Sequence, residues 1–150
     1  MSSVDTLDVL STVAAVGSGM VAGIFFAFSV FMMRAFAALP PAQGIAAMQT
    51  VNRVIVTPLF LVLFLGTAVV GVIAAIVGAV PQVVGAALYV LGAIVVTGTR
   101  NVPWNNELDA LTPDTAAAAE YWLGYLRRWT AWNHVRTVTS TGAAVAFVVS

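Results

Sequence analysis

Long apolar runs separated by short polar segments make up this chain. Four runs have the length of a membrane span; they cover Val13 to Met33, Val54 to Val80, Gln82 to Thr99, and Trp129 to Val149. A helix needs roughly 20 residues to cross the hydrocarbon core of a bilayer, about 30 Å thick. Because backbone groups in lipid must be satisfied within the segment, helices are expected. The pattern predicts an all-α, integral-membrane four-helix bundle, with residues 1–150 as a single domain.

Turn and cap residues predict where the first helices begin and bend. Asp5 has the character of an N-cap, which places the start of the first helix near Thr6. The short segment GAVPQ between the second and third spans predicts a tight turn and an antiparallel hairpin. Pro58 cannot donate a hydrogen bond to the carbonyl of Val54, so we expect a kink or a free acceptor there.

The segment between the third and fourth spans is predicted to be a polar loop. Pro103 restricts the residue before it and is expected to end the third helix. Asn105 or Asn106 would then cap a short helix that begins at Glu107. The run Thr112-Pro113-Asp114 predicts the start of an extended fourth helix, whose first half stands at or above the membrane surface.

The composition supports a membrane protein and excludes several function classes. Apolar residues make up 61% of the chain and charged residues 8%, against about a quarter charged in a typical soluble protein. The mean hydropathy is +0.99. A formal net charge of zero gives no electrostatic basis for nucleic-acid binding, and the absence of cysteine excludes disulfides and thiolate sites. The lipid bilayer is therefore the expected partner, and the first run, too long for a signal peptide, is expected to be a retained helix.

The basic residues suggest an orientation in the membrane. All of them are arginines, and they lie near span ends that face one side: Arg34, Arg53, Arg100, Arg127, Arg128 and Arg136. The positive-inside rule places that side, with the loops between spans one and two and between spans three and four, in the cytoplasm. Both termini are then predicted to lie outside.

Small residues recur at every fourth position of the first span, namely at Ala15, Gly19, Gly23 and Ala27. Such a ridge lets another helix approach closely. The expected neighbour is a helix of the same chain, with a homo-oligomer as the alternative.

The start of the fourth span carries an unusual polar face. Trp122, Trp129, Asn133 and Arg136 follow helical spacing and share one side, whereas His134 lies on another stripe. An arginine within a span costs on the order of a few kcal/mol unless it faces a polar cavity or a partner. Arg136 is therefore a candidate site residue.

All the asparagines of the chain fall on the arginine-rich side of the predicted bundle: Asn52, Asn101, Asn105, Asn106 and Asn133. An asparagine amide carries both donors and an acceptor, which suits it to orienting flat polar ligands. Capping does not explain all of them. We therefore expect a ligand cavity open toward this side, with Glu107, Asp109 or the asparagines as the nearest partners of Arg136.

Several segments resemble a known family, the anthrone-oxygenase-like family of small four-span membrane proteins. The resemblance rests on GIFFAFSVFMM in the first span, NRVIVTPLF opening the second, TGTRNVPWNNEL ending the third, and WLGYLRRWTAWNHVR opening the fourth. It covers nearly the whole chain. It implies the four-span fold and, for characterised members, oxidation of anthrones to anthraquinones with molecular oxygen.

The residues suit an oxygenase that needs no cofactor. With one histidine and no cysteine, the chain lacks the usual ligands of a metal site, and a glycine-rich phosphate loop is absent. In this hypothesis His134 is the general base, with Glu107 or a substrate hydroxyl as alternatives. Arg136, Asn105, Asn101 and Asn133 stabilise the oxyanion. A flat slot for the substrate is expected from Trp104, Trp129 and Trp132, with Asn52 and Asn106 as further substrate contacts.

A non-enzymatic function explains the same residues. A small bundle with a polar, aromatic-rimmed cavity suits binding of a quinone or a lipid, or a place as a subunit in a larger membrane assembly. In that case Arg136 and the asparagines form a buried structural network.

Overall fold

The computed structural model describes residues 3–150, with side chains described from Thr6 onward, and this part of the chain contains helices but no strand. In chain order the helices are α1 (Ser3–Ala27), η1 (Phe28–Met32), α2 (Met33–Ala38), α3 (Pro41–Val54), α4 (Pro58–Val77), α5 (Val80–Tyr89), η2 (Val90–Val95), η3 (Thr97–Asn101), α6 (Val102–Asp109) and α7 (Ala116–Val148). The elements labelled η are π-helical turns within longer helical runs. The predicted all-α class is confirmed.

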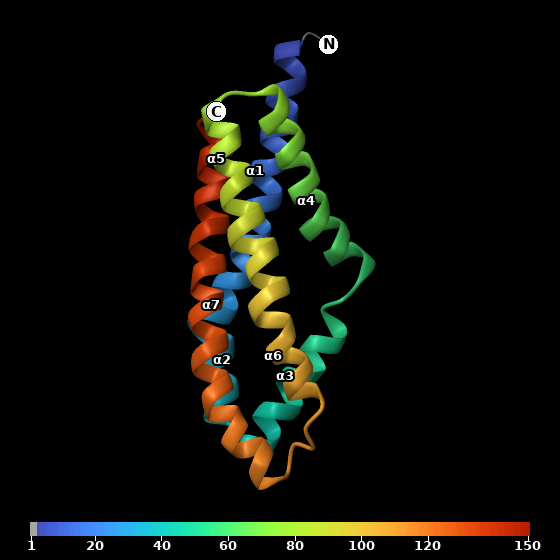
Figure 1. Ribbon diagram of the computed structural model, residues 1–150, viewed down its shortest axis with the longest axis vertical. Helices are drawn as coiled ribbons and strands as arrows, with labels where there is room; N and C mark the ends of the chain where they lie inside the picture. Colours follow the sequence, from blue (N-terminus) through green and yellow to red (C-terminus); the bar gives the residue numbers. More distant parts are fainter. Residues whose placement is uncertain (1–2) are drawn as a thin grey trace.

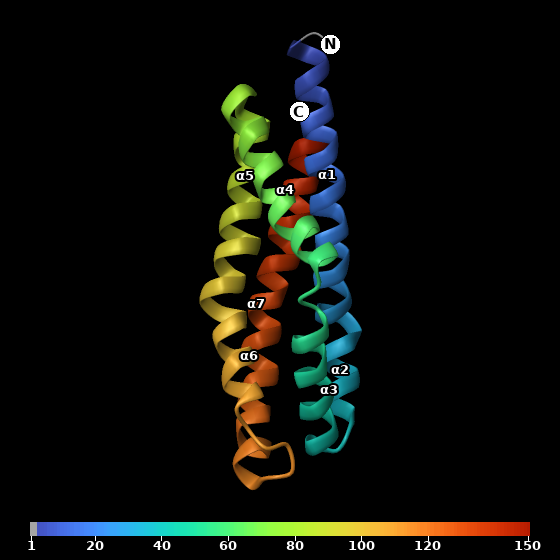
Figure 2. The ribbon, with the colours of Figure 1, turned by 90° about the vertical axis from the view of Figure 1, so that its right-hand side faces the viewer.

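The helices pack lengthwise into an elongated molecule (Figures 1 and 2). Helix α1 packs against α7 and α4, and α5 packs against the same two helices. Helices α4 and α5 are joined by Gly78 and Ala79 alone, which confirms the hairpin. Both ends of the chain lie at the same end of the molecule (Figure 1).

The helix predicted to bend at Pro58 is broken there. Helix α3 ends at Val54, and α4 begins at Pro58, where the Thr57 hydroxyl accepts a hydrogen bond from the Phe60 amide at 3.2 Å. Residues 55–57 lie outside both helices, and the chain swings outward at this point (Figure 1). The physical reason is the one expected, since proline removes the hydrogen bond that a continuous helix requires.

The polar segment around Pro103 is helical, so the predicted polar loop and the helix end at Pro103 are wrong. The helix runs on from η3 through α6 to Asp109, and the connecting loop covers only residues 110–115. The Val102 amide donates to the Thr97 carbonyl in the π-helical pattern, and Pro103 follows in the first turn of α6, where a proline is tolerated. Asn105 and Asn106 lie inside α6 and do not cap a helix.

Two helix starts also differ from the prediction. Helix α1 begins at Ser3, ahead of Thr6. Helix α7 begins at Ala116 with Thr115 as its N-cap, whose hydroxyl accepts a hydrogen bond from the Ala118 amide at 3.2 Å, because 112–115 form a turn first. The extended form of this helix is confirmed by its 33 residues.

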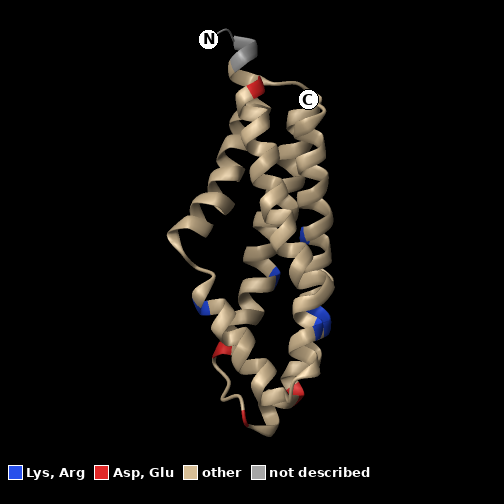
Figure 3. Ribbon diagram, turned by 180° about the vertical axis from the view of Figure 1, so that it is seen from behind, with Lys and Arg blue, Asp and Glu red and all other residues tan. Residues whose placement is uncertain are grey.

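Three helical runs of the described chain are long and apolar enough to cross a membrane: Thr6–Ala38, Pro58–Val77 and Val80–Asp109. The arginines lie between the middle of the molecule and the end opposite the termini (Figure 3). The fourth span, within α7, stays a prediction.

Two groups of buried side chains fill the interior. One, nearer the termini, is built from small and aromatic residues such as Ala14, Tyr89 and Phe147. The other, at the opposite end, is dominated by aromatic rings of α7, including Trp122 and Trp129. In the small-residue ridge of α1, Ala15 is buried, whereas Gly19 and Gly23 are exposed with open space beside them, so the homo-oligomer remains a prediction.

Candidate functional site

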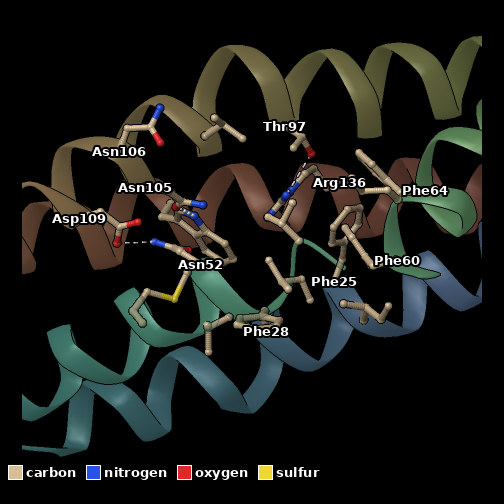
Figure 4. Close-up of a pocket in the computed structure, with 18 residues that line it drawn as sticks. Phe25, Phe28, Asn52, Phe60, Phe64, Thr97, Asn105, Asn106, Asp109 and Arg136 are labelled. Atoms are coloured by element: carbon tan, nitrogen blue, oxygen red, sulfur yellow. Dashed lines mark hydrogen bonds between the residues drawn. The ribbon is translucent and has the colours of Figure 1, made fainter. Parts of the chain in front are cut away.

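A cavity of about 260 Å³ opens beside the break between α3 and α4 (Figure 4). Residues from α1, η1, α3, α4, η3, α6 and α7 line it, so nearly every part of the fold contributes. An apolar cavity of about 150 Å³ is enough to hold one benzene ring. The space here therefore suits a ligand of two or three fused rings, with part of it in the open mouth.

Arg136 is the buried cation at the inner end of this cavity, with its side chain 5% exposed. Its guanidinium donates hydrogen bonds to the Thr97 hydroxyl at 3.1 Å and to the Asn133 side-chain oxygen at 2.6 Å. It also lies over the rings of Phe25 and Trp129, at 4.2 and 5.0 Å from the ring centres. All of these partners are neutral, and among the described residues no carboxylate pairs with the charge. Its Nε–H is buried without an acceptor.

Asn133 holds this guanidinium in place from one helical turn away. Its side chain is fully buried, and its amide nitrogen donates to the Phe25 carbonyl and to the Ser29 hydroxyl, both at 2.7 Å. The Ser29 hydroxyl in turn bonds Thr137 at 3.0 Å. This network locks the amide so that its oxygen faces Arg136, which makes Asn133 a positioning residue.

Asn105 supplies an oriented amide in the middle of the cavity (Figure 4). Its side-chain oxygen accepts hydrogen bonds from the Tyr125 hydroxyl and from the Trp129 indole nitrogen, both at 2.8 Å. Because an indole N–H can only donate, the oxygen of the amide is identified without ambiguity. The amide nitrogen makes no hydrogen bond within residues 3–150, so its two N–H groups remain available to a ligand in the cavity it lines.

Aromatic rings form the walls around these polar groups. Phe60 and Phe64 stack with ring centres 5.6 Å apart, and Phe25 meets Phe64 edge to face at 6.2 Å. Phe28 packs against Trp129 at 5.7 Å. Such faces suit a flat apolar ring system, and they keep water from the inner end.

The outer end of the cavity carries a carboxylate. Asp109, the one carboxylate among the described lining residues, accepts a hydrogen bond from the Asn52 amide at 3.2 Å. This bond joins α6 to α3 across the mouth (Figure 4). Asn106 is exposed and lines the edge of the same opening.

Several residues predicted for the site lie outside the cavity lining, namely Asn101, Trp104, Trp132, Asn133 and His134. Asn101 is buried and donates to the Trp129 carbonyl at 3.3 Å, so it braces α7 against η3. Trp104 lies beneath the Arg128 guanidinium, 5.4 Å from it, and Trp132 lies beneath Arg100 at 4.9 Å. Of the predicted tryptophan slot, only Trp129 faces the cavity.

His134 is separated from Arg136. It is exposed and lines a different surface groove with Arg34 and Arg127, between α2 and α7. The two side chains therefore serve different cavities, as the spacing of 134 and 136 on one helix allows. Glu107 is also outside the lining, because its carboxylate accepts a hydrogen bond from the Tyr121 hydroxyl at 2.6 Å. Partial burial, together with this acceptor, raises the pKa of the Tyr121 phenol above its usual range.

Asp109 was expected only as a possible partner of Arg136, whereas Thr97 and the phenylalanines of the walls were not predicted for the site. A usable signal exists for the walls, because Phe25 and Phe28, like Phe60 and Phe64, lie one turn apart on a helix. Thr97 opens the polar TGTRN segment but has no chemical feature that marks it in advance.

The arrangement suits the binding of a flat, electron-rich anion. An unpaired guanidinium and a free amide face the same space, and both only donate there. A desolvated site strengthens their attraction for negative charge. Within the described residues no three His, Asp or Glu side chains lie close enough together to hold a metal ion.

Comparison with known families gives one match, to the model described as anthrone oxygenase, over residues 9–146. No curated protein and no solved structure matches the chain.

Proposed function

The chain belongs to the anthrone oxygenase family, and on that premise we propose that it is a membrane-embedded oxygenase which oxidises an anthrone-like or other polycyclic phenolic substrate. Molecular oxygen is the co-substrate, and no bound cofactor is required. The observation that carries the proposal is Arg136, a buried cation without an anionic partner among the described residues, at the end of an aromatic-walled cavity.

The energetics favour an anionic ligand at this position. A charged side chain at membrane depth costs on the order of a few kcal/mol, and cation–π contacts with two desolvated rings return about 2 kcal/mol or more. The two hydrogen bonds offset part of the remainder, but the charge stays uncompensated. A ligand oxyanion would complete the site.

The proposed reaction begins with the ionised substrate. An anthrone loses a proton from its benzylic carbon to water at the open mouth, and its carbonyl oxygen takes up the negative charge beside Arg136 and the Asn105 amide. The anion then reduces O₂ and binds it at the benzylic carbon, and the peroxide anion formed takes one proton back from water. Loss of water from the resulting hydroperoxide leaves the quinone carbonyl, so one CH₂ group and one O₂ yield one C=O and one H₂O.

In this reaction Arg136 and Asn105 stabilise the developing charge, while Asn133 positions the guanidinium. His134 has no part in it, since it lines another groove. A side-chain base such as His134 is not required in this reaction. Arg136 and Asn105 stabilise the substrate anion and so lower the pKa of the bound substrate enough for water to accept the proton.

The membrane arrangement is part of the proposal. We place α7 from Trp129 to Val149 as the fourth span beside the three apolar runs, which completes a four-helix bundle. An even number of crossings agrees with two termini at one end of the molecule. The arginine-rich half is placed in the cytoplasm and the termini outside.

The test is oxygen uptake and anthraquinone formation by the purified, detergent-solubilised chain with an anthrone, in the presence of a chelator. Arg136→Met is expected to lose turnover, whereas His134→Ala is expected to keep it within about twofold. Both variants are checked for folding by size-exclusion chromatography.

A wild-type rate no higher than the spontaneous oxidation of the anthrone contradicts the oxygenase. Retained binding of an anthraquinone under those conditions would favour the alternative, a bundle that binds a quinone or lipid without turnover.

A further inference from the structure

The cavity has polar ends of opposite character. At the inner end the Arg136 guanidinium presents donors and positive charge, while the Asn105 amide lies between the two ends, in the middle of the cavity. At the outer end Asp109 presents carboxylate oxygens, which accept hydrogen bonds and cannot donate when ionised. Aromatic rings line the space between the ends (Figure 4).

The outer pair is held across the mouth by a single bond. The Asn52 amide donates to one oxygen of Asp109 at 3.2 Å, and the two residues are 57 positions apart in the chain. Within the described residues the second oxygen of Asp109 makes no hydrogen bond, and the pair is partly exposed to solvent. Such a pair adds little to stability. Because Asn52 and Asp109 both line the cavity, we look to ligand binding rather than to stability for the role of this pair.

The separation of the two ends sets the shape of the ligand. Thr97, which bonds Arg136, and Asp109 lie 12 residues apart on one helical run, a backbone separation of at most roughly 18 Å at the α-helical rise of about 1.5 Å per residue. The Arg136 and Asp109 side chains reach into the cavity, so the ligand itself spans a shorter distance. A ligand that reaches both ends must therefore lie lengthwise in the cavity. It needs an oxygen acceptor at one end of its ring system and a hydroxyl donor at the other.

We propose that Asn52 and Asp109 determine specificity by binding a hydroxyl at the far end of the ligand, while Arg136 binds its oxyanion. This rests on the proposed function for the anion at Arg136, and it adds the requirement for a second, distant hydroxyl. Asp109 accepts the hydrogen bond, and Asn52 fixes the carboxylate that does so.

The experiment compares the binding of two anthraquinones that cannot be oxidised further by this reaction. 2,6-Dihydroxyanthraquinone has hydroxyls at both long ends, and 2-hydroxyanthraquinone has one. Their absorbance reports binding to the purified chain in detergent micelles. A hydrogen bond to a charged group corresponds to roughly 10- to 100-fold in affinity, and the wild type is expected to prefer the dihydroxy compound by such a factor.

Asp109→Ala is expected to reduce this preference to about twofold while leaving the affinity for the monohydroxy compound unchanged. Asn52→Ala is expected to remove part of the preference, and Asp109→Glu to retain some of it. The matched control is Glu107→Gln, which removes an acid two residues away that does not line the cavity. Its preference should equal that of the wild type.

Equal weakening of both compounds by Asp109→Ala would overturn the inference, as would a preference that this variant leaves intact. So would a wild-type chain that binds neither compound. Should Asp109→Ala fail to fold, Asp109→Asn is used instead, because it keeps the size and polarity of the side chain. Its preference for the dihydroxy compound is expected to fall as well, but by a smaller factor. Oxygen uptake is measured separately, so a failed oxygenase leaves these binding results interpretable, and a failed specificity pair leaves the oxygenase standing.

Discussion

The two ends of this molecule are stabilised in different ways. Near the termini, helices approach closely through small residues, and the Phe147 ring lies between Gly71 and Gly85. At the opposite end hydrogen bonds and stacked rings dominate, with Trp122, Tyr125 and Trp129 in one continuous stack along α7. The first region contains no arginine, and the second contains the buried Arg136 near its boundary.

The two regions have different roles: the region near the termini holds the helices together, and the opposite region contains the cavity that binds a ligand. Near the termini Ala14, Tyr89 and Phe147 pack closely, and neither Arg136 nor the asparagines of the cavity belong to that group. The other region tolerates a broken helix, π-helical turns and an uncompensated charge. Features of this kind cost stability and persist where they serve a site. We therefore expect substitutions in the two regions to have different consequences.

Arg136→Met should have the largest effect on ligand affinity, because it removes the buried charge that distinguishes the cavity region from the region near the termini. Loss of a buried, hydrogen-bonded charge typically changes binding by about 2–5 kcal/mol, or roughly 30- to 5,000-fold in affinity. Affinity for 2-hydroxyanthraquinone should fall by such a factor. Thermal stability should change little, because removal of an unpaired buried charge offsets the loss of the donor to the buried Asn133 oxygen.

Absorbance titration with 2-hydroxyanthraquinone, used as an anionic dye, measures the affinity. Thermal unfolding of the same samples measures the stability. A variant that loses stability in proportion to affinity would show that Arg136 is a structural residue of the bundle rather than a ligand-binding one.

Gly85→Ala tests the opposite end and should affect stability alone. A Cβ at this position would lie 2.9 Å from the Phe147 ring, and overpacking of this kind costs about 1–3 kcal/mol. Affinity of the folded fraction for the dye should not change. Gly19→Ala is the matched control, because open space surrounds Gly19, and it should leave stability unchanged or raise it by up to about 1 kcal/mol. Equal effects of the two substitutions on unfolding would contradict the packing difference.

Asn105→Asp sharpens the description of the cavity. The carboxylate still accepts from Tyr125 and Trp129, but the free N–H groups are lost and a negative charge enters a site built for an anion. Affinity for the anionic dye should fall roughly 10- to 100-fold, about 1.4–2.8 kcal/mol. Asn106→Asp adds the same charge at the exposed edge and should change affinity several-fold less. Titration of both variants with 2-hydroxyanthraquinone measures the two losses of affinity. A larger loss for Asn106→Asp would place the bound anion nearer Asn106 than Asn105.

Alkaline pH should weaken the aromatic stack slightly. Burial, followed by the neighbouring Tyr121 and Asp109, raises the pKa of the Tyr125 phenol well above its ordinary value of 10.0. The folded state therefore favours the neutral phenol, and this contribution is fully present below about pH 10 and is lost as pH rises further. Unfolding of the wild type and of Tyr125→Phe, followed from pH 7 to pH 11, should show a stability difference that shrinks above pH 10. A constant difference would mean that Tyr125 does not titrate with unfolding.

Much of the fold follows from the sequence because lipid-compatible helices leave few alternatives. The apolar runs, the hairpin at Gly78 and the interruption at Pro58 were each predicted from a local rule that the structure obeys. The buried stripe of α7 through Trp122, Trp129 and Arg136 also follows from helical spacing.

The parts that could not be predicted depend on contacts between distant segments. Thr115 and Thr112 are both acceptable caps, and the turn geometry decides between them. Pro103 reads as a helix end, but a π-helical turn before it keeps the helix going. Of the residues predicted for the site, five line one cavity, Asn52, Asn105, Asn106, Trp129 and Arg136, whereas His134 faces another groove. Helical spacing within α7 had already put His134 and Arg136 on different faces, but which cavity each one enters depends on α2 and α6.

The helical run from η3 into α6 makes the site sensitive to the number of residues in the chain as well as to their identity. Each residue of an α-helix turns the chain by about 100°, and a π-helical turn accommodates one residue more than an α-helical turn does. Deleting one residue from Thr97–Asn101 would restore an α-helical turn and leave the orientation of α6 nearly unchanged. Deleting one residue from the α-helical stretch 102–104 would instead rotate the rest of α6 by about 100°. Asn105 and Asp109 would then leave the cavity together, although every side chain of the site would still be present in the sequence.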